Sequence, residues 1–421
     1  MTIEKIYPAV EDKYFNSSDF NGLPVRELSG DFDIESPAFR EILRGAIESN
    51  RITARFSGNP HILAFSAMPK AHVLDAFDKA ENLAYVCLYP HADSLRSSLR
   101  LSAYRDRPYD LELARGQGQF DFRAFDLAVL EQYRNDPRYS YETDFIHGQI
   151  CIESAYYEST EVPEHDQILL QTFGFAYDDN LNRYVAVYLR YLSDLSPEHQ
   201  RIWAAKEVTG KIKLHPDYFE STINGSWGSR LSIFEAFVME LQVVNEMSLI
   251  MGRKPLFRHS YADGRPKEFG FLLRPTITEF NDFILLLDKM MSDNIDKAFF
   301  GTDVELEDEE ERGDGKIVVK PKGTIQILEA WFSKLFQAGD SSPIDNMIAT
   351  FKKVRKLRQK PAHRVNPDAF DQGIFRAQRD IVIEAYSAVR TLRLALANHP
   401  AVRSNPPDID EQLFKGEIWD M

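Results

Sequence analysis

An arginine and a histidine that could act together on a phosphate lie in the stretch LRQKPAH, residues 357–363. Arg358 and His363 are five positions apart, with Pro361 between them. Arginine is permanently charged and its planar fork matches a phosphate, whereas histidine exchanges protons near neutral pH. The spacing alone does not identify a site, because three other Arg/His pairs are similarly spaced. They are Arg55/His61, Arg253/His259 and Arg393/His399.

The surroundings of the three other pairs favour structural interpretations. The first spans RFSGNPH, where Gly and Asn-Pro indicate a turn. The second follows a predicted helix end and is interpreted as a connector. The third ends the last long predicted helix, where a basic residue interacts favourably with the helix dipole.

Arg358 differs because it falls on the apolar side of its predicted helix. At about 100° per residue, an apolar stripe runs along residues 344–354. Arg355 and Arg358 both lie in line with that stripe, and a guanidinium among core positions needs a partner or a ligand. Pro361 lacks the backbone N–H, so we expect the helix to end or kink there and to release His363 from helical geometry.

The charge around this stretch contrasts with that of the whole chain. The net charge is −15, which argues against a protein that coats nucleic acid nonspecifically. Residues 350–405 nevertheless contain twelve Lys or Arg against four acids. This local excess predicts a surface that faces an anion.

Length and composition limit the remaining possibilities. With 421 residues, the chain is long enough for two or three domains. No apolar run approaches the roughly 20 residues needed to cross a bilayer, and the N-terminal residues lack the pattern of a signal peptide. Cys87 and Cys151, the two cysteines, lie in strand-like apolar contexts and are expected to be reduced core residues. We therefore expect a cytoplasmic protein that does not contact membranes.

The elements that must position these residues divide the chain into two kinds of sequence. Residues 1–195 read as a mixed α/β sensing or regulatory domain, with a β-hairpin predicted over 168–192 around an Asp/Asn-rich turn. Residues 196–270 read as a helical connector that begins with Ser196-Pro197, an order typical of a helix start.

The C-terminal part predicts helices packed in a bundle. Residues 271–405 contain four long amphipathic patterns and one acidic insertion at 304–314, which we expect to be a solvated loop. Residues 406–421 read as a polar tail. The predicted fold class is α+β, with an N-terminal mixed α/β region followed by a C-terminal antiparallel helical bundle.

The stretch KVRKLRQKPAH on the penultimate long helix, with a long amphipathic helix after it, resembles the signature of the HEPN superfamily. The resemblance covers roughly residues 270–400. It implies metal-independent RNA cleavage by a symmetric dimer, in which His363 transfers a proton and Arg358 stabilises charge on the phosphate. The 2′-hydroxyl of the RNA would be the nucleophile, so neither a metal nor a cofactor is expected.

The resemblance also assigns the neighbouring polar residues. Gln359 occupies the polar position after the arginine, where the family more often has Asn, Asp or His. Arg355, Lys360 and Arg364 are expected to assist in binding the substrate.

Two functions remain open on the sequence. The first is an endoribonuclease effector of the toxin or phage-defence type, with RNA as substrate, a homodimer or higher oligomer as the active form, and an antitoxin or other protein as a further partner. The second is a catalytically inactive HEPN-like protein that binds nucleic acid or a nucleotide, or that acts as a scaffold.

Overall fold

The computed structural model describes most of the chain. The described residues are 2–56, 58–65, 68–144, 146–226, 230–311, 313, 317–336, 339–359 and 368–419. They form a mixed fold of helices and predominantly antiparallel strands, as the α+β prediction states. The chain divides into two compact units: Met1–Tyr141 with His147–Phe219, and Glu142–Ile146 with Glu220–Met421.

The N-terminal part of the first unit is built on a three-stranded antiparallel sheet of order β1-β3-β2. This sheet packs with helices around a core that includes Val10, Phe39, Ile52 and Leu88. The Ser36 hydroxyl accepts a hydrogen bond from the Phe39 N–H and so begins α2, as expected for Ser before Pro. The elements are α1 Ile3–Asn16, β1 Leu23–Pro24, η1 Val25–Leu28, α2 Pro37–Glu48, β2 Ile52–Arg55, α3 Lys70–Lys79, β3 Cys87–Pro90, α4 Ala92–Leu95 and η2 Leu99–Tyr104.

The rest of the first unit is built on a seven-stranded sheet. Its order is β5-β6-β7-β8-β4-β9, and β10 pairs with β7. The predicted hairpin is confirmed: β7 Leu169–Tyr177 and β8 Arg183–Tyr188 pair antiparallel, and Asp178 accepts backbone hydrogen bonds from Asn180 and Asn182 in the turn. The other elements are α5 Pro108–Ala114, β4 Phe122–Phe125, η3 Leu127–Leu130, α6 Glu131–Asn135, β5 Tyr139–Thr143, β6 His147–Ile152, η4 Glu164–Asp166, α7 Leu189–Ser193, α8 Pro197–Ala204, β9 Glu207–Val208, β10 Lys213–Leu214 and α9 Pro216–Ile223.

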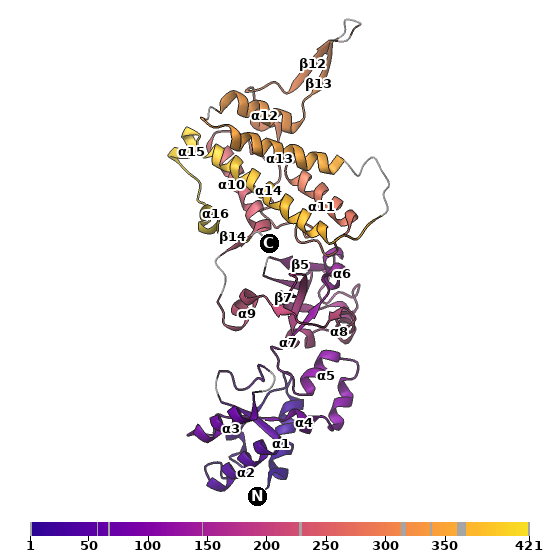
Figure 1. Cartoon of the computed structure of the whole chain (residues 1–421), viewed down its shortest axis with the longest axis vertical. Coiled ribbons are helices and arrows are strands. Elements are labelled where there is room, and N and C mark those ends of the chain that lie inside the picture. Colours follow the sequence, from indigo (N-terminus) through magenta and orange to yellow (C-terminus); the bar gives the residue numbers. More distant parts are fainter. Residues whose placement is uncertain are drawn as a thin grey trace. The chain divides into compact units, whose positions relative to one another are not determined.

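The second unit is dominated by long helices that pack on one another. In Figure 1, α13 lies alongside α14 and α11, and α14 lies alongside α10. The buried side chains between them include Phe237, Leu287, Phe351, Val354 and Leu392. The elements are β11 Leu231–Ser232, α10 Ile233–Ile250, α11 Ile277–Met290, η5 Lys297–Phe300, β12 Glu307–Glu311, β13 Ile317–Pro321, α12 Thr324–Leu335, α13 Ser342–Gln359, α14 Gly373–Leu396, α15 Pro400–Ser404, α16 Glu411–Lys415 and β14 Ile418–Trp419.

The acidic insertion is not the loop that its charge predicts. Residues Glu307–Glu311 form strand β12, which pairs antiparallel with β13 (Figure 1). Asp308 lies opposite Lys320 in the register and its carboxylate is 3.3 Å from the Lys322 ammonium. Opposite charges across and beside the strand therefore offset part of the repulsion among the acids.

The two units divide the chain differently from the three predicted segments and tail. Of the predicted connector 196–270, α8 belongs to the first unit and α10 to the second, and the division at residue 219 falls within α9. The predicted tail, 406–421, contains α16 and β14, and β14 pairs in parallel with β11 at the start of α10.

Candidate functional site

Two arginines on α13 come together with two aspartates near the end of α11. Arg355 and Arg358 are three positions apart and therefore share one face of α13. Asp288 belongs to the last turn of α11. Asp293 lies in the turn that follows, and its backbone N–H donates to the Asp288 carbonyl oxygen. The four side chains form a closed set of ion pairs, which we call the Arg–Asp quartet.

Each carboxylate in the Arg–Asp quartet bridges both arginines. Asp288 accepts from Arg355 Nε at 3.0 Å and from Arg358 Nη1 at 2.7 Å. Asp293 accepts from Arg355 Nη2 at 2.6 Å and from Arg358 Nη1 at 2.5 Å. The side chain of Asp288 is fully buried, and a buried carboxylate needs such partners because its desolvation is costly.

The two arginines use different parts of their guanidinium groups. Arg355 donates through Nε and Nη2, so its bidentate edge is occupied by the aspartates. Arg358 donates to both aspartates through Nη1 alone, and within the described residues its Nε and Nη2 have no hydrogen-bond partner. The Arg358 side chain is 32% exposed. The hydrogen bond to Asp288, and less strongly the one to Asp293, raises the pKa of Arg358, which is therefore charged at all relevant pH values.

The start of α11 also contacts the segment that precedes α14. Thr276 and Phe370 form an antiparallel bridge, and the Asp368 carboxylate accepts the backbone N–H of Thr278 at 3.0 Å. This backbone hydrogen bond lowers the pKa of Asp368. Helix α11 thus contacts the chain on both sides of residues 360–367, through the Arg–Asp quartet and through Asp368.

The structure places some of the predicted site residues and not others. Arg355 and Arg358 lie together as described, and Gln359 ends α13 with an exposed side chain. Lys360, His363 and Arg364 lie outside the described residues. The helical wheel indicated that Arg355 and Arg358 need partners. It gave no means of finding the aspartates, which lie 62 to 70 positions away in the chain.

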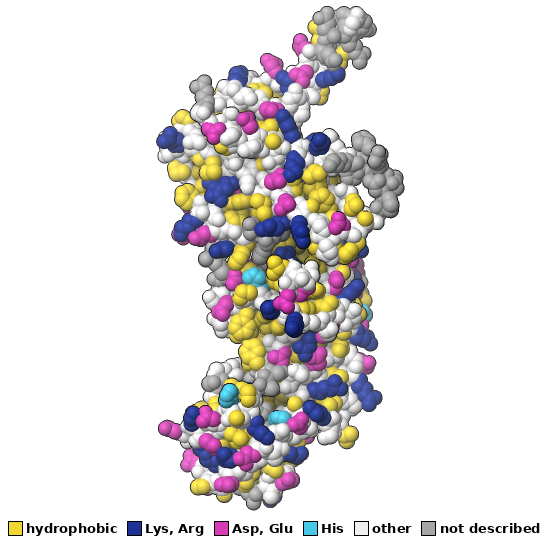
Figure 2. Space-filling view, viewed as in Figure 1, with side chains coloured by type: hydrophobic (Ala, Val, Ile, Leu, Met, Phe, Trp, Pro, Cys, Tyr) yellow, Lys and Arg dark blue, Asp and Glu magenta, His cyan; other side chains and the backbone are white. Residues whose placement is uncertain are grey.

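The basic excess of residues 350–405 is offset by acids from other elements. Glu329 of α12, Glu240 of α10 and the two quartet aspartates lie outside this stretch and pair with it. On the face shown in Figure 2, Lys and Arg side chains over the helices of the second unit are interspersed with Asp and Glu. Counting charges along the sequence therefore overstates the basic character of this surface. The pairs with acids outside the stretch are Lys352 with Glu329 and Arg393 with Glu240, and Lys353 pairs within the stretch with Glu384.

The arginines of the other three Arg/His pairs have structural partners. Arg253 pairs with Asp303 at 2.6 Å and packs over the ring of Trp331. Arg55 lies in strand β2, not in a loop, and donates to backbone oxygens. Arg393 is 3% exposed and bonds to the buried Glu240 at 2.5 Å. The interpretation of Arg393 as a residue serving the helix end is therefore wrong, because its side chain points into the protein core.

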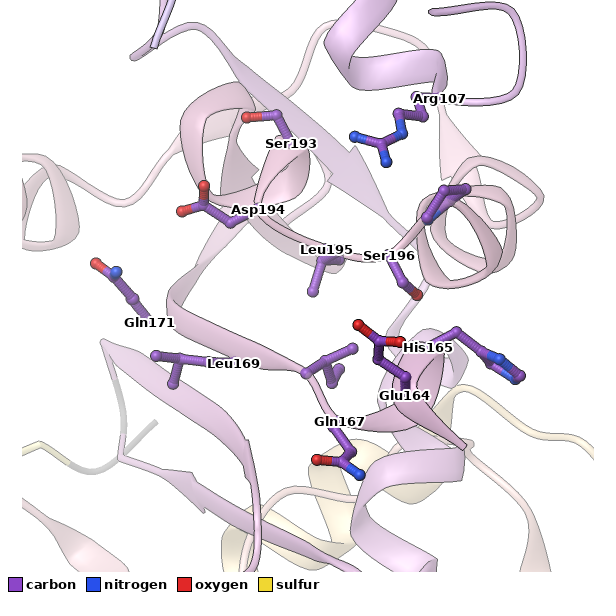
Figure 3. A pocket seen from close by; sticks show the side chains of 12 residues that line it. Arg107, Glu164, His165, Gln167, Leu169, Gln171, Ser193, Asp194, Leu195 and Ser196 are labelled. Carbon is purple, nitrogen blue, oxygen red and sulfur yellow. The ribbon is translucent and has the colours of Figure 1, made fainter. Parts of the chain in front are cut away.

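A concave region lies in the first unit. A cavity of about 820 Å³ is bordered by η4, the start of β7 and the segment between α7 and α8. Figure 3 shows Arg107 and Glu164 facing this cavity from opposite sides. Several of its polar groups already serve the backbone: Gln167 bonds to the Ser159 and Val162 carbonyls, and Ser196 begins α8. With one arginine and two acids, Glu164 and Asp194, among the remaining groups, the cavity does not favour one class of ligand.

Both cysteines are free thiols. Cys87 is buried, as predicted, and burial raises its pKa to about 11. Cys151 is only half-buried. A thiol with a raised pKa is a poor nucleophile at neutral pH, so Cys87 is inert.

Other kinds of site receive no support from the described residues. In the described part of the chain, no three His, Cys, Asp or Glu side chains are arranged to hold a metal ion. No helix among the described elements combines the length and apolarity needed to cross a bilayer. Comparison with protein-family models, curated proteins and solved structures found no match.

Proposed function

We propose that this protein is a metal-independent endoribonuclease that acts through Arg358 and His363. The observation that carries the proposal is the geometry of Arg358. Two carboxylates hold its Nη1, and its Nε and Nη2 have no partner within the described residues. This edge offers two parallel N–H donors, the arrangement that binds a phosphate in a bidentate manner.

The proposed reaction is an internal transfer at one phosphodiester. The 2′-oxygen attacks phosphorus, His363 takes the proton of the 2′-hydroxyl or delivers one to the departing 5′-oxygen, and Arg358 stabilises the negative charge that develops on the phosphoryl oxygens. The bond to the 5′-oxygen breaks, and the products are a 2′,3′-cyclic phosphate and a 5′-hydroxyl. Gln359, Lys360 and Arg364 would contact neighbouring groups of the RNA.

The proposal includes the arrangement of the helices and the assembly. Helices α11, α12, α13 and α14, all within residues 271–405, would form a HEPN-like antiparallel bundle, and two bundles would pair so that both Arg358/His363 sets line one cleft. A cytoplasmic toxin or phage-defence effector, regulated by an antitoxin or another protein, is the role that the HEPN resemblance implies. Residues 1–195 would sense the activating signal.

A second function, binding without turnover, is favoured by the charge balance of the Arg–Asp quartet. Two carboxylates offset two guanidinium groups, so the site has less positive charge with which to stabilise a transition state at phosphorus than its arginines suggest. Gln359 stands where the HEPN resemblance more often implies Asn, Asp or His. In this case the protein would bind RNA or a nucleotide, or act as a scaffold.

Cleavage of RNA by the full chain in the presence of EDTA tests the first function. We expect 2′,3′-cyclic phosphate ends, and we expect His363→Ala to reduce the rate by about 10²- to 10⁴-fold, the usual contribution of general acid–base catalysis. Arg358→Ala should reduce it comparably. His259→Ala is the matched control, because this histidine belongs to a similarly spaced Arg/His pair and its side chain is exposed. The cleavage rate of this variant should equal that of the unaltered protein.

Three outcomes contradict the mechanism. They are cleavage that persists in His363→Ala, cleavage that requires an added metal ion, and products that end in a free 3′-hydroxyl. Binding of RNA with no cleavage in the unaltered protein would favour the second function.

A further inference from the structure

We infer that Asp288 and Asp293 are positioning residues that aim the Nε–Nη2 edge of Arg358 at a single phosphodiester group. This inference rests on the proposed function, in which Arg358 contacts the RNA. The aspartates do not touch the substrate themselves. They act by fixing the orientation of the arginine.

The hydrogen bonds of Arg358 fix the plane of its guanidinium. Nη1 carries two N–H groups, and each has an acceptor: Asp288 at 2.7 Å and Asp293 at 2.5 Å. Because the guanidinium is planar and rigid, holding both N–H groups of one nitrogen also sets the direction of the opposite edge. Asp288 is fully buried and belongs to α11, so the packing of the core fixes the position of the carboxylate that holds Arg358.

Arg355 completes the arrangement without competing for the ligand. Its Nε and Nη2 are committed to Asp288 and Asp293, so its bidentate edge is closed. The quartet contains two carboxylates, and the charge of Arg358 alone balances only one of them. The charge of Arg355 balances the other. The two arginines therefore have different tasks: Arg355 stabilises the aspartates, and Arg358 presents an open edge.

Positioning and simple charge make opposite predictions for the same substitution. Replacing Asp288 by Asn removes a negative charge beside an anion site, so electrostatics alone predicts tighter binding of RNA. If Asp288 positions Arg358, the substitution loosens the guanidinium and binding becomes weaker. The sign of the change decides between the two.

The test measures the binding of a fluorescent 2′-O-methyl oligoribonucleotide to the full chain by anisotropy, at one fixed salt concentration. This probe has no free 2′-hydroxyl and cannot be cleaved by the proposed reaction, so binding is read separately from catalysis. We expect Arg358→Lys, which keeps the charge and loses the fork, to weaken binding by about tenfold, the equivalent of one charge-assisted hydrogen bond. We expect Asp288→Asn to weaken binding by about three- to tenfold.

Two further variants control for folding and for charge. Because Asp288 is buried, its replacement could unfold the second unit, which circular dichroism would reveal. Asp293→Asn then carries the test, since Asp293 is 39% exposed, bonds to the same Nη1 and should also weaken binding. Glu329→Gln removes one carboxylate from an exposed pair with Lys352 on α13, and binding should be unchanged or slightly tighter.

The outcomes separate this inference from the proposed function. Tighter or unchanged binding in folded Asp288→Asn and Asp293→Asn would overturn the inference even if the unaltered protein cleaves RNA. Weaker binding in these variants supports the inference even if the unaltered protein does not cleave RNA, in which case only the nuclease proposal fails. If the unaltered protein does not bind the oligonucleotide, the inference is wrong.

Discussion

His199 lies at the centre of a buried chain of hydrogen bonds in the first unit. Trp203 Nε1 donates to the Tyr133 hydroxyl at 2.9 Å, and this hydroxyl donates to Nδ1 of a neutral His199 whose proton is on Nε2, at 2.7 Å. His199 Nε2 then carries the proton and donates to Asp166 at 3.2 Å. A protonated His199 could not accept from Tyr133, and burial, which is only partly offset by Asp166, lowers the pKa of His199.

This histidine should make the first unit sensitive to acid. A histidine in the unfolded chain has a pKa of about 6.5. Since the folded state lowers that pKa, unfolded chains take up the proton first, and the contribution of His199 to stability is lost as the pH falls below about 6.5. We expect thermal unfolding temperatures to fall between pH 7.5 and pH 5.5, and to fall less in His199→Gln. An equal fall in both proteins would show that His199 does not contribute.

At the scale of residues, the sequence indicated which arginines need partners but did not identify those partners. The helical wheel predicted that Arg355 and Arg358 face the core and need partners, and both have them. The identity of the partners depends on how α11 lies against α13, which no local pattern encodes. The same limit applies to Arg393, whose partner Glu240 is 153 positions away.

At the scale of elements, helices α10 and α14 are joined by a buried ion pair. Glu240 and Arg393 are 0% and 3% exposed, and Arg393 Nε donates to Glu240 Oε2. Burial raises the pKa of Glu240, although the hydrogen bond from Arg393 opposes this effect. Breaking such a pair leaves one charge without compensation inside the protein.

Substitutions at this pair should show strong coupling. We expect Arg393→Leu to destabilise the second unit by about 3–5 kcal/mol, because it leaves a carboxylate buried without a partner. The double substitution Glu240→Leu with Arg393→Leu should recover most of that loss, since two apolar side chains of suitable volume can replace a buried pair. Urea unfolding of the single and double variants measures this, and additive effects would contradict the expectation.

Helix N-cap residues correctly predicted the starts of some helices. Local sequence did not predict strand β12, because its formation depends on pairing with β13. Ser196 and Thr276 begin helices as their sequence context indicates, each accepting a backbone N–H three residues later. The acidic stretch 304–314 is predicted as a loop because a run of like charges is typical of a solvated segment. Its partner, β13, supplies the lysine and β-branched residues that make pairing possible, and that partner could not be identified from the acids alone.

At the scale of the whole molecule, each unit has its own hydrophobic core. Val10 and Leu88 belong to the core of the first unit, and Phe351 and Leu392 to that of the second. The Arg–Asp quartet and the Glu240–Arg393 pair lie within the second unit. The proposed chemistry therefore depends on residues of the second unit.

The proposed mechanism requires two chains. We expect light scattering to give a mass of twice the 48.5 kDa of one chain at micromolar concentration, because the proposed cleft is lined by two Arg358/His363 sets. The RNA cleavage rate per chain should fall on dilution below the dissociation constant of the dimer. A monomeric mass together with full cleavage activity would contradict the dimeric mechanism.

The closed set formed by Asp288, Asp293, Arg355 and Arg358 constrains how this protein can diverge. Each acid serves both bases and each base serves both acids, so a change at one position leaves the other three mismatched. Single substitutions at these four positions are therefore expected to be unfavourable. In homologous sequences we expect the four residues to be retained or replaced as a group, and loss of the arginines should coincide with loss of the buried acid at position 288.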